Sequence, residues 1–380
     1  MKLCIIVANS LRKDPRVIKQ IRCAIDEGID VHFVGFMDDN YNKEFLESVG
    51  CHYSIIDLGK KYHGHLKSVI KTIYREFMHL YLPIKTMVRI KPDVIHANDF
   101  NTLIQAYIAS KICKCRVLYD SHEICAENIG IADKKIRKNT IIVLEHLLLK
   151  RIGAMVSVSN AAAAYFSHKY KIQLPTVITN CPYKSNMPIA KDKALDGFEA
   201  LYQGQMYQGR GYEEFVRSAG FLKNNITLVI RGYGSIEGEL RKIVADENLG
   251  NRVRFDGPVE IKDIVSKASE SHLGVVLTQP LNINFKLTVS NKIFEYIHAG
   301  LPVLLSDIPE HRYLNEKFNF GIIVNEFSPT GIAECINFLA TNPEKYNVLR
   351  NNAIKASDTM CWENESKKLI GIYNRLFQKQ

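Results

Sequence analysis

Short apolar runs alternate with helix-like segments along the first half of the chain. The apolar runs are "KLCIIVA", "VHFVGF", "DVIHAND", "CRVLYDSHE", "GAMVSVSN" and "TVITNCP". Runs that are apolar over their whole length are typical of strands buried on both faces of a sheet. Their alternation with helices, the first over residues 15–28, therefore predicts βαβ units and a parallel sheet.

The same alternation starts again near residue 199, with apolar runs at "FEALYQGQM", "ITLVIRGYG", "VRFDGPV", "LGVVLTQ", "PVLLSD" and "FGIIVNEFSP". The segment between the halves, residues 180–198, is polar and contains two prolines. We therefore predict two parallel α/β domains, over residues 1–182 and 199–361, joined by a linker over 183–198. A loop is expected between "LGVVLTQ" and the next helix.

Polar clusters follow the strands of both predicted domains. They are "ANSLRKDPR", "HANDF", "YDSHE", "GQMYQGRG", "RGYGS" and "TQPLNINFKLTVSNK". Two-domain α/β proteins bind ligands in the cleft between the domains, at the carboxyl ends of the strands. The coincidence of these clusters therefore predicts a ligand site in such a cleft.

The segment "SNKIFEYIHAG" predicts a short helix that begins after Ser290 and carries one acid, Glu295. The amides at the helix start, around Asn291, together with the cation Lys292 suit a phosphate group. Glu295 is placed to accept hydrogen bonds from a ribose diol. The alternative is that Ser290 caps the helix and Glu295 only complements the helix dipole.

Glycines and one arginine follow the first strand of the second half, in "GQMYQGRG". Gly204 lets a ligand approach the backbone, and Arg210 suits a forked contact with a diphosphate. The alternative is a glycine-rich turn with a solvent-facing arginine. The cluster "RGYGS", which contains Gly232, resembles only half of a dinucleotide fingerprint.

Histidines and acids end two neighbouring strands of the first half. "YDSHE" contains Asp120, His122 and Glu123, and "IHAND" contains His96 and Asp99. A histidine at a strand end suits charge stabilisation or proton relay at a reaction centre. The alternative is a structural histidine.

The segment "SLRKDPRVIKQ" follows the first strand. Asp14 is expected to cap a helix in which Pro15 is the first residue. Arg16 has no such structural explanation, and we predict that it faces the cleft and meets an anionic donor or acceptor.

Composition and charge narrow the function classes. The chain is 46% hydrophobic and 24% charged, as in soluble globular proteins, and no apolar run approaches the about 20 residues of a membrane span. Nine cysteines without a CxxC pair indicate reduced thiols in a cytosolic protein. No D-x-D pair at a strand end, H-E-x-x-H motif or Walker loop is present, so no metal is expected.

The net charge of +10 is concentrated in the first half, where residues 1–182 have 26 Lys and Arg against 17 Asp and Glu. Residues 60–91 contribute eight cations against Glu76, interleaved with apolar residues. The cations are Lys60, Lys61, Lys67, Lys71, Arg75, Lys85, Arg89 and Lys91. This composition favours an anionic membrane surface as partner over nucleic acid, for which no recognition motif is present; the alternative is an ordinary solvated helix face.

Taken in order, the clusters resemble the family-4 retaining glycosyltransferases of bacterial polysaccharide biosynthesis. The matching pieces span nearly the whole chain: "DPRV", "PDVIHANDFNTL", "VLYDSHE", "VSVSNAAAAYF", "VITNCP", "LYQGQMYQGRG", "LVIRGYG", "VRFDGPV", "SNKIFEYIHAGLPVLLSD", "GIIVNEFSP" and "CWENESKKLIGIYNRLF". The resemblance implies the GT-B fold, with two Rossmann-like domains facing across a cleft. It also implies that the last helix, residues 362–380, packs back on the N-terminal domain.

The resemblance also implies roles for the candidate residues. His122 would lie beside the transferred sugar, Glu295 would bind the ribose, and Arg210 would act on the diphosphate. Other donor contacts would come from Gly204, Gln205, Gly232, Val259, Ser290, Asn291 and Lys292. The acceptor would enter past Asp14, Arg16, His96 and Asp99. Transfer would retain the anomeric configuration without a metal or other cofactor.

The chain departs from the family pattern at two positions. The family often has a second glutamate eight residues before Glu295, where this chain has Leu287, so one contact to the donor sugar is missing. The family also often has an arginine where this chain has Gln205, which leaves the diphosphate to Arg210 and Lys292.

The sequence thus predicts a glycosyltransferase of the hexosyltransferase type, cytoplasmic or peripheral on the inner face of the cytoplasmic membrane. Its donor would be a UDP- or GDP-sugar, and its acceptor would be a lipid-linked glycan. The reaction would belong to the assembly of a cell-surface polysaccharide such as capsule or lipopolysaccharide. One alternative is a nucleotide-sugar 2-epimerase of the same fold. The other is a non-catalytic sugar- or membrane-binding relative, for which the missing acid at Leu287 leaves room.

Overall fold

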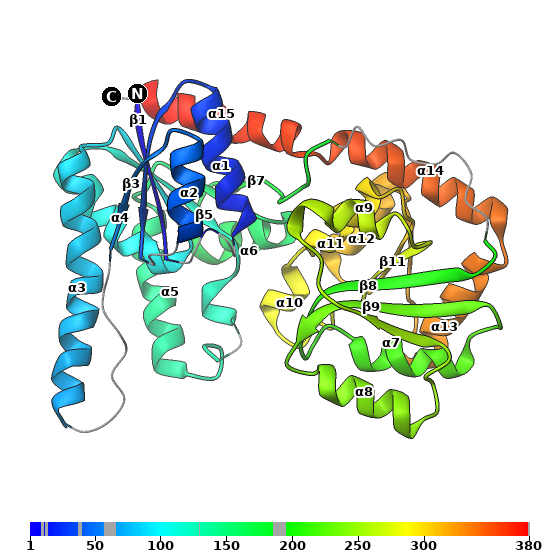
Figure 1. Cartoon of the computed structure of the whole chain (residues 1–380). Coiled ribbons are helices and arrows are strands. Elements are labelled where there is room, and N and C mark those ends of the chain that lie inside the picture. The colour runs from blue at the N-terminus through cyan, green and yellow to red at the C-terminus, as the bar shows by residue number, and fades with distance from the viewer. Residues whose placement is uncertain are drawn as a thin grey trace. The chain divides into compact units, whose positions relative to one another are not determined.

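The computed structural model describes residues 1–8, 11, 14–36, 40–56, 66–128, 130–184 and 195–378, without the side chains of 40–42 and 66–73. The chain forms two compact units, Met1–Ile178 with Ser366–Gln380, and Thr179–Glu365 (Figure 1). Both units are α/β, as the alternating sequence pattern predicts.

The first unit is built on a parallel sheet of seven strands in the order β3-β2-β1-β4-β5-β6-β7. The strands are β1 (Lys2–Val7), β2 (Asp30–Gly35), β3 (His52–Ile55), β4 (Val94–Asn98), β5 (Arg116–Ser121), β6 (Ala154–Ser157) and β7 (Thr176–Val177). The strand order reverses between β1 and β4, which is where open α/β sheets place their ligands. The segments that follow β1, β4 and β5 therefore converge at one edge.

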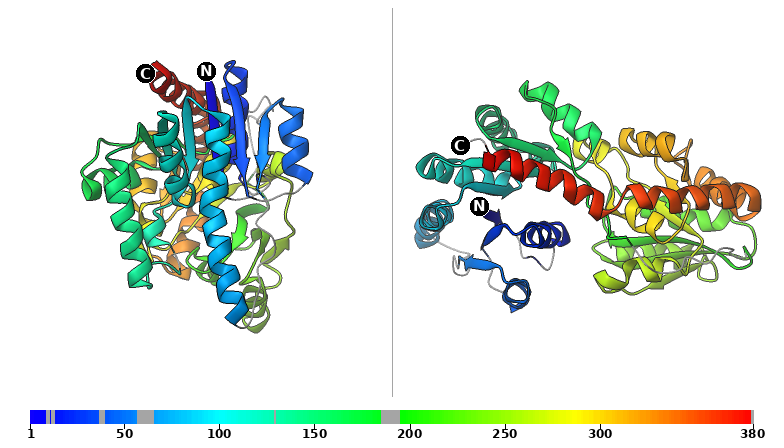
Figure 2. Two further views of the ribbon diagram at one scale, coloured as in Figure 1. Left: turned by 90° about the vertical axis from the view of Figure 1, so that its left-hand side faces the viewer. Right: turned by 90° about the horizontal axis from the view of Figure 1, so that it is seen from above.

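The helices of the first unit connect these strands (Figure 2). They are α1 (Pro15–Asp26), α2 (Asn40–Ser48), α3 (Leu66–Ile90), α4 (Phe100–Cys113), α5 (Lys135–Leu149) and α6 (Asn160–Tyr170), with the short 3-10 turn Cys125–Glu127. The last helix, α15 (Trp362–Gln378), belongs to this unit from Ser366 onward, so the C-terminal helix returns to the N-terminal domain. Asp14 caps α1 by accepting from the Val17 amide at 3.3 Å, with Pro15 in the first turn, as predicted.

The second unit has a six-stranded sheet in the order β10-β9-β8-β11-β12-β13. Its strands are β8 (Phe198–Met206), β9 (Ile226–Gly234), β10 (Val253–Asp256), β11 (Leu273–Val276), β12 (Val303–Leu305) and β13 (Gly321–Ile323). Its helices are α7 (Tyr212–Ser218), α8 (Glu237–Asp246), α9 (Ile264–Ala268), α10 (Ile283–Leu287), α11 (Asn291–His298), α12 (Pro309–Phe318), α13 (Pro329–Ala340) and α14 (Pro343–Thr359). Buried side chains of β8, β9 and β11 form its core together with those of α7 and α13.

Helix α11 is held against this sheet by one aromatic residue. Tyr296 packs on Gly274 of β11, where an added Cβ would collide with the tyrosine ring. Its hydroxyl accepts a hydrogen bond from the Gln203 amide of β8 at 2.9 Å. Gly274 therefore allows the close approach that fixes α11, and with it Glu295, beside the end of β8.

Two local expectations differ from the structure. The predicted loop before α11 contains a helical turn, α10, whose five residues are too few for a periodic pattern. Ser290 occupies the N-cap position of α11, but its hydroxyl makes no capping hydrogen bond.

Residues 185–194 of the predicted linker lie outside the described residues. The predicted cleft between the domains stays a prediction.

Candidate functional site

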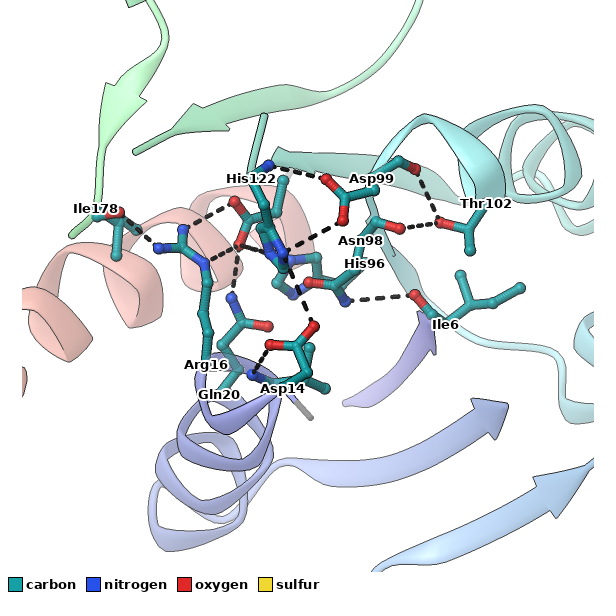
Figure 3. Close-up of polar contacts among 12 residues, drawn as sticks. Ile6, Asp14, Arg16, Gln20, His96, Asn98, Asp99, Thr102, His122 and Ile178 are labelled. Atoms are coloured by element: carbon teal, nitrogen blue, oxygen red, sulfur yellow. Dashed lines mark hydrogen bonds and ion pairs between the residues drawn. The ribbon is translucent and has the colours of Figure 1, made fainter. Parts of the chain in front are cut away.

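Seven polar residues gather at the carboxyl ends of β1, β4 and β5 in the first unit (Figure 3). We call them the His122 cluster: Asp14, Arg16, Gln20, His96, Asp99, Asp120 and His122. They come from α1 and the residue before it, from β4 and the residue after it, and from β5 and the residue after it. Segments distant in sequence thus meet because parallel neighbouring strands end at the same edge.

Asp120 is the buried centre of this cluster. Its carboxylate receives two hydrogen bonds from Arg16, at 2.9 and 2.8 Å, and one from the Gln20 amide at 2.6 Å. Burial raises the pKa of Asp120, but the charges of Arg16 and His122 outweigh burial and hold that pKa well below its ordinary value. Asp120 is therefore ionised at any physiological pH.

The imidazole of His122 lies among three carboxylates. Its Nδ1 is 3.3 Å from Asp99 Oδ2 and 3.8 Å from Asp14 Oδ2, and its Nε2 is 3.6 Å from Asp120 Oδ2. Burial lowers the pKa of His122, but the neighbouring charges of Asp99 and Asp120 raise it to about 9. His122 is therefore an imidazolium at neutral pH, suited to stabilising negative charge rather than to removing a proton.

Asp99 holds His122 from two sides. Its Oδ1 accepts the His122 amide at 3.0 Å, while its Oδ2 faces the ring. Asp99 has φ 61° and ψ 164°, a region that residues with a side chain rarely adopt, and its carboxylate makes no capping bond to α4. In this strained conformation the Asp99 carboxylate does not cap α4 and binds His122 instead.

The predicted acceptor-side residues divide into two groups by burial. Asp14, Asp99 and His122 are 12%, 29% and 16% exposed, so a ligand can reach them. Arg16 and His96 are buried, and Arg16 is bound to Asp120 and to the Ile178 carbonyl at 2.7 Å. The expectation that Arg16 meets a substrate anion is therefore revised: its guanidinium already has an internal partner. Gln20 was missed, because nothing in the sequence pairs it with Asp120.

The second unit brings two predicted cations together. The side chain of Lys292 lies over Gly204, where an added Cβ would stand 2.7 Å from the ammonium nitrogen. Burial, and after it the nearby charge of Arg210, lower the pKa of Lys292 to about 8, against the opposing effect of Glu295. Two like charges held together in this way suit an anion, and the predicted diphosphate role of these residues stays a prediction.

Arg210 is oriented by aromatic rings. Its guanidinium carbon lies 4.9 Å from the Tyr207 ring centre and 5.2 Å from that of Phe285 on α10, and its Nε donates to the Tyr207 hydroxyl at 3.0 Å. Among the described residues, no carboxylate lies within ion-pair distance of Arg210. The aromatic partners were not predicted; they fix the cation without neutralising it.

Glu295 is partly buried and fixed by β8. The side-chain amide of Gln203 donates to its Oε2 at 2.8 Å. The backbone amide of the same glutamine donates to the Tyr296 hydroxyl, so Gln203 binds two neighbouring residues of α11. This arrangement leaves the carboxylate near Lys292 and close to the start of α11.

The remaining predicted donor residues lie in the same unit. Gly232 pairs with Gly204 in the β8–β9 ladder, and Gln205 donates to the Tyr233 hydroxyl at 3.3 Å. Asn291 is the first residue of α11, and Val259 lies in the segment after β10.

The described residues contain neither a candidate metal site nor a helix that could cross a membrane. No group of three or more His, Cys, Asp and Glu side chains there is arranged to hold a metal ion. No helix among them combines the length and apolar character that crossing a membrane requires. Metal independence itself stays a prediction.

Comparison with solved structures identifies the fold. The Anabaena protein Alr3699/HepE in complex with UDP and glucose superposes with a TM-score of 0.76 at 16% identity, over 99% of this chain and 100% of that one. A sucrose-phosphate synthase from Thermosynechococcus elongatus has a TM-score of 0.75 at 16% identity over 100% of both chains. The lipopolysaccharide outer core galactosyltransferase WaaB has a TM-score of 0.69 at 12% identity over 99% of both. The chain therefore has the GT-B fold.

Sequence comparison adds one match. No curated protein sequence matches the chain significantly. Residues 185–356, which contain the Lys292, Arg210 and Glu295 group, match the family model described as "Glycosyl transferases group 1". Most of the second unit is thus similar in sequence to glycosyl transferases of group 1.

Proposed function

We propose that this protein is a retaining glycosyltransferase that moves a sugar from a nucleotide diphosphate sugar to a glycan acceptor. The observation that carries the proposal is the pair of cations Lys292 and Arg210 beside Glu295, in a domain of the glycosyl transferase group 1 type. The same elements would hold the two halves of a nucleotide sugar, its diphosphate and its ribose.

In this proposal the diphosphate lies between the start of α11 and Arg210. The free amides at Asn291 and Lys292 and the two cations donate to phosphate oxygens. Glu295, already held by Gln203, accepts from the ribose hydroxyls. UDP is the favoured nucleotide, since the fold neighbour from Anabaena was crystallised with UDP and glucose.

The charges of the site suit the chemistry of transfer. As the bond between sugar and phosphate breaks, negative charge develops on the departing diphosphate, and Lys292 and Arg210 stabilise it without a metal. The role proposed for the cationic His122 and the carboxylate of Asp99 is to act on the transferred sugar. With His122 already protonated, the departing phosphate is the better acceptor for the proton of the attacking hydroxyl.

The proposed acceptor is lipid-linked, and the proposed place of action is the inner face of the cytoplasmic membrane, in polysaccharide assembly. Helix α3 supports this: Tyr74, Phe77 and Tyr81 are exposed on it among Arg75 and Lys85. Exposed aromatic side chains interleaved with cations suit an anionic lipid surface. Lys60 and Lys61 of the basic segment lie outside the described residues, as do the side chains of Lys67 and Lys71.

The test uses a panel of UDP- and GDP-sugars, with and without lipid-linked glycan acceptors, and follows both nucleotide release and product. Acceptor-dependent release with retained configuration supports the proposal. Sugar isomerisation without a second substrate would indicate an epimerase. Binding without turnover on any pair would indicate a binding protein.

The matched variants are Glu295→Ala and Glu270→Ala. Glu270 is an exposed acid whose partner is Lys267 on the surface, so its variant should keep wild-type activity. Glu295→Ala should lose at least about a hundredfold in kcat/KM for the donor while it keeps the fold. Near wild-type activity in Glu295→Ala would rule out the ribose role.

A further inference from the structure

We propose that Tyr373, on the C-terminal helix, is a positioning residue that acts on the His122 cluster through the buried ring of His96. This inference rests on the proposed function only in that His122 is taken to face the reacting groups. Its structural part, the state of the His96 ring, stands without it.

Tyr373 reaches the cluster from α15, 277 residues beyond His96. Its hydroxyl oxygen lies 2.7 Å from His96 Nδ1, and both side chains are completely buried. On the other side of the imidazole, Nε2 lies 3.6 Å from Asp120 Oδ2. The ring of His96 therefore joins the last helix to the carboxylate beneath His122.

The protonation states of these groups follow from their surroundings. Burial lowers the pKa of His96, so its ring is neutral and carries a single N–H. Burial raises the pKa of Tyr373 well above its ordinary value, so the phenol keeps its proton. Asp120, held by Arg16, is ionised.

With one N–H on His96, two arrangements are possible, and only one satisfies every group. If Nδ1 carried the proton, the bare Nε2 lone pair would face the Asp120 carboxylate, which is repulsive. If Tyr373 donates to Nδ1 instead, the proton lies on Nε2 and points at Asp120. The Asp120 carboxylate thus favours the Nε2–H tautomer of His96, and the Tyr373 hydroxyl stabilises that tautomer and fixes the ring by donating to Nδ1.

This tautomer gives the ionised Asp120 a further N–H beside those of Arg16 and Gln20. The carboxylate that faces His122 Nε2 is then surrounded by donors and held in one orientation. His122 is placed in turn between this fixed carboxylate and Asp99. Tyr373 therefore acts on His122 through two intervening side chains, and touches neither substrate nor reacting atoms.

The test compares Tyr373→Phe with Tyr346→Phe. Tyr346 is an equally buried tyrosine in the second unit whose hydroxyl donates to the His272 carbonyl at 3.1 Å, so it controls for loss of a buried hydroxyl. Nitrogen-15 NMR of the imidazoles should show His96 as the Nε2–H tautomer in the wild type and in Tyr346→Phe. In Tyr373→Phe the tautomer should stay the same, but the resonance of the bare Nδ1 should move to that of a nitrogen without a hydrogen bond.

Activity provides the second readout. Tyr373→Phe should lower kcat about tenfold with little change in the donor KM, because the donor residues are in the other unit. A glutamine at position 96 keeps an N–H near the place of Nε2, so in the His96→Gln background Tyr373→Phe should cost less than twofold. The double variant thereby separates positioning from a general loss of packing.

Several results would overturn the proposal. They are an Nδ1–H tautomer in the wild type, an unchanged Nδ1 resonance in Tyr373→Phe, or a fall in kcat no larger than that of Tyr346→Phe. If Tyr373→Phe does not fold, the wild-type tautomer still decides. If no donor is turned over by any form, the proposed function fails while the NMR result stands by itself.

Discussion

Arg16 and Asp120 form a two-pronged ion pair in the interior of the first unit. The distances are 2.9 Å from Nε and 2.8 Å from Nη2, and the two side chains are 3% and 1% exposed. An arginine that the sequence places at the entrance of a ligand site is thus the internal counterion of the site. The pair holds α1 to the end of β5 and sets the charge under His122.

Replacing Arg16 with lysine should destabilise the protein strongly. A lysine cannot make both hydrogen bonds, and Asp120 would remain as a poorly paired buried charge, so we expect a loss of about 3 kcal/mol in the free energy of unfolding. The matched control is Arg254→Lys, at a half-exposed arginine that pairs with Glu199 and Asp256. Denaturant unfolding should show that Arg254→Lys lowers the free energy of unfolding by less than about 1 kcal/mol. Equal losses in the two variants would contradict the internal role of Arg16.

The charge of His122 should make the free energy of unfolding decrease as the pH rises above neutral. Its folded pKa of about 9 exceeds the unfolded value of about 6.5, so its stabilising contribution is complete below pH 6.5 and is lost as the pH rises through 9. The charged and titratable groups that face it are Asp14, Arg16, His96, Asp99 and Asp120.

Asp99→Asn removes the carboxylate nearest to Nδ1 and should lower the His122 pKa. The measurement is an NMR titration of the His122 ring, together with unfolding midpoints from pH 6 to 10. The alkaline loss of stability should be smaller in Asp99→Asn and should be complete at a lower pH than in the wild type. Asp307→Asn, at an exposed acid paired with Arg312, is the control and should leave the titration unchanged. An unshifted His122 titration in Asp99→Asn would refute this account.

The fold and the convergence of the site were accessible from the sequence for one reason. Apolar runs mark buried parallel strands, and the residues directly after such strands meet at one edge, so Asp99 and His122 could be placed together. The cap at Asp14 is local in sequence and was also predictable. These inferences need only the order of elements along the chain.

What the sequence did not disclose depends on contacts between distant segments. Arg16 meets Asp120 across 104 positions, and His96 meets Tyr373 across 277. No local pattern encodes such pairs, since the strand order and the packing of α15 decide them. Phe285 was missed as a partner of Arg210 because α10 is too short to produce a periodic signal.

Lys292 should take up a proton when the nucleotide binds. Its pKa of about 8 leaves part of the free protein uncharged near pH 8, and a diphosphate would raise that pKa. Calorimetric titration with UDP at pH 8, in buffers of different ionisation enthalpy, should therefore show net proton uptake. Lys292→Met should abolish the uptake and weaken UDP about tenfold to hundredfold. Lys286→Met, at an exposed lysine on α10, should do neither; uptake that persists in Lys292→Met would assign the proton elsewhere.

Gly204 should not tolerate a side chain. Its φ of 120° disfavours any other residue, and an added Cβ would displace the Lys292 side chain. Gly204→Ala should therefore cost about 1–2 kcal/mol in unfolding free energy and weaken UDP binding as well. Gly238→Ala on α8 has open space around its Cβ and should be neutral or slightly stabilising. Unchanged UDP affinity in Gly204→Ala would show that Lys292 does not depend on this close approach.

Helix α3 should bind anionic vesicles through its exposed aromatic residues. Phe77 is 58% exposed beside Tyr81 and Arg75, so its ring is free to enter the lipid interface. Co-sedimentation with vesicles containing phosphatidylglycerol should be stronger than with neutral vesicles and should weaken with salt. Phe77→Ser should reduce it severalfold, whereas Phe338→Ser, at a 45% exposed phenylalanine on α13, should not. Equal binding to neutral and anionic vesicles would contradict the electrostatic contribution to binding. Equal binding by the two variants would show that α3 is not the membrane contact.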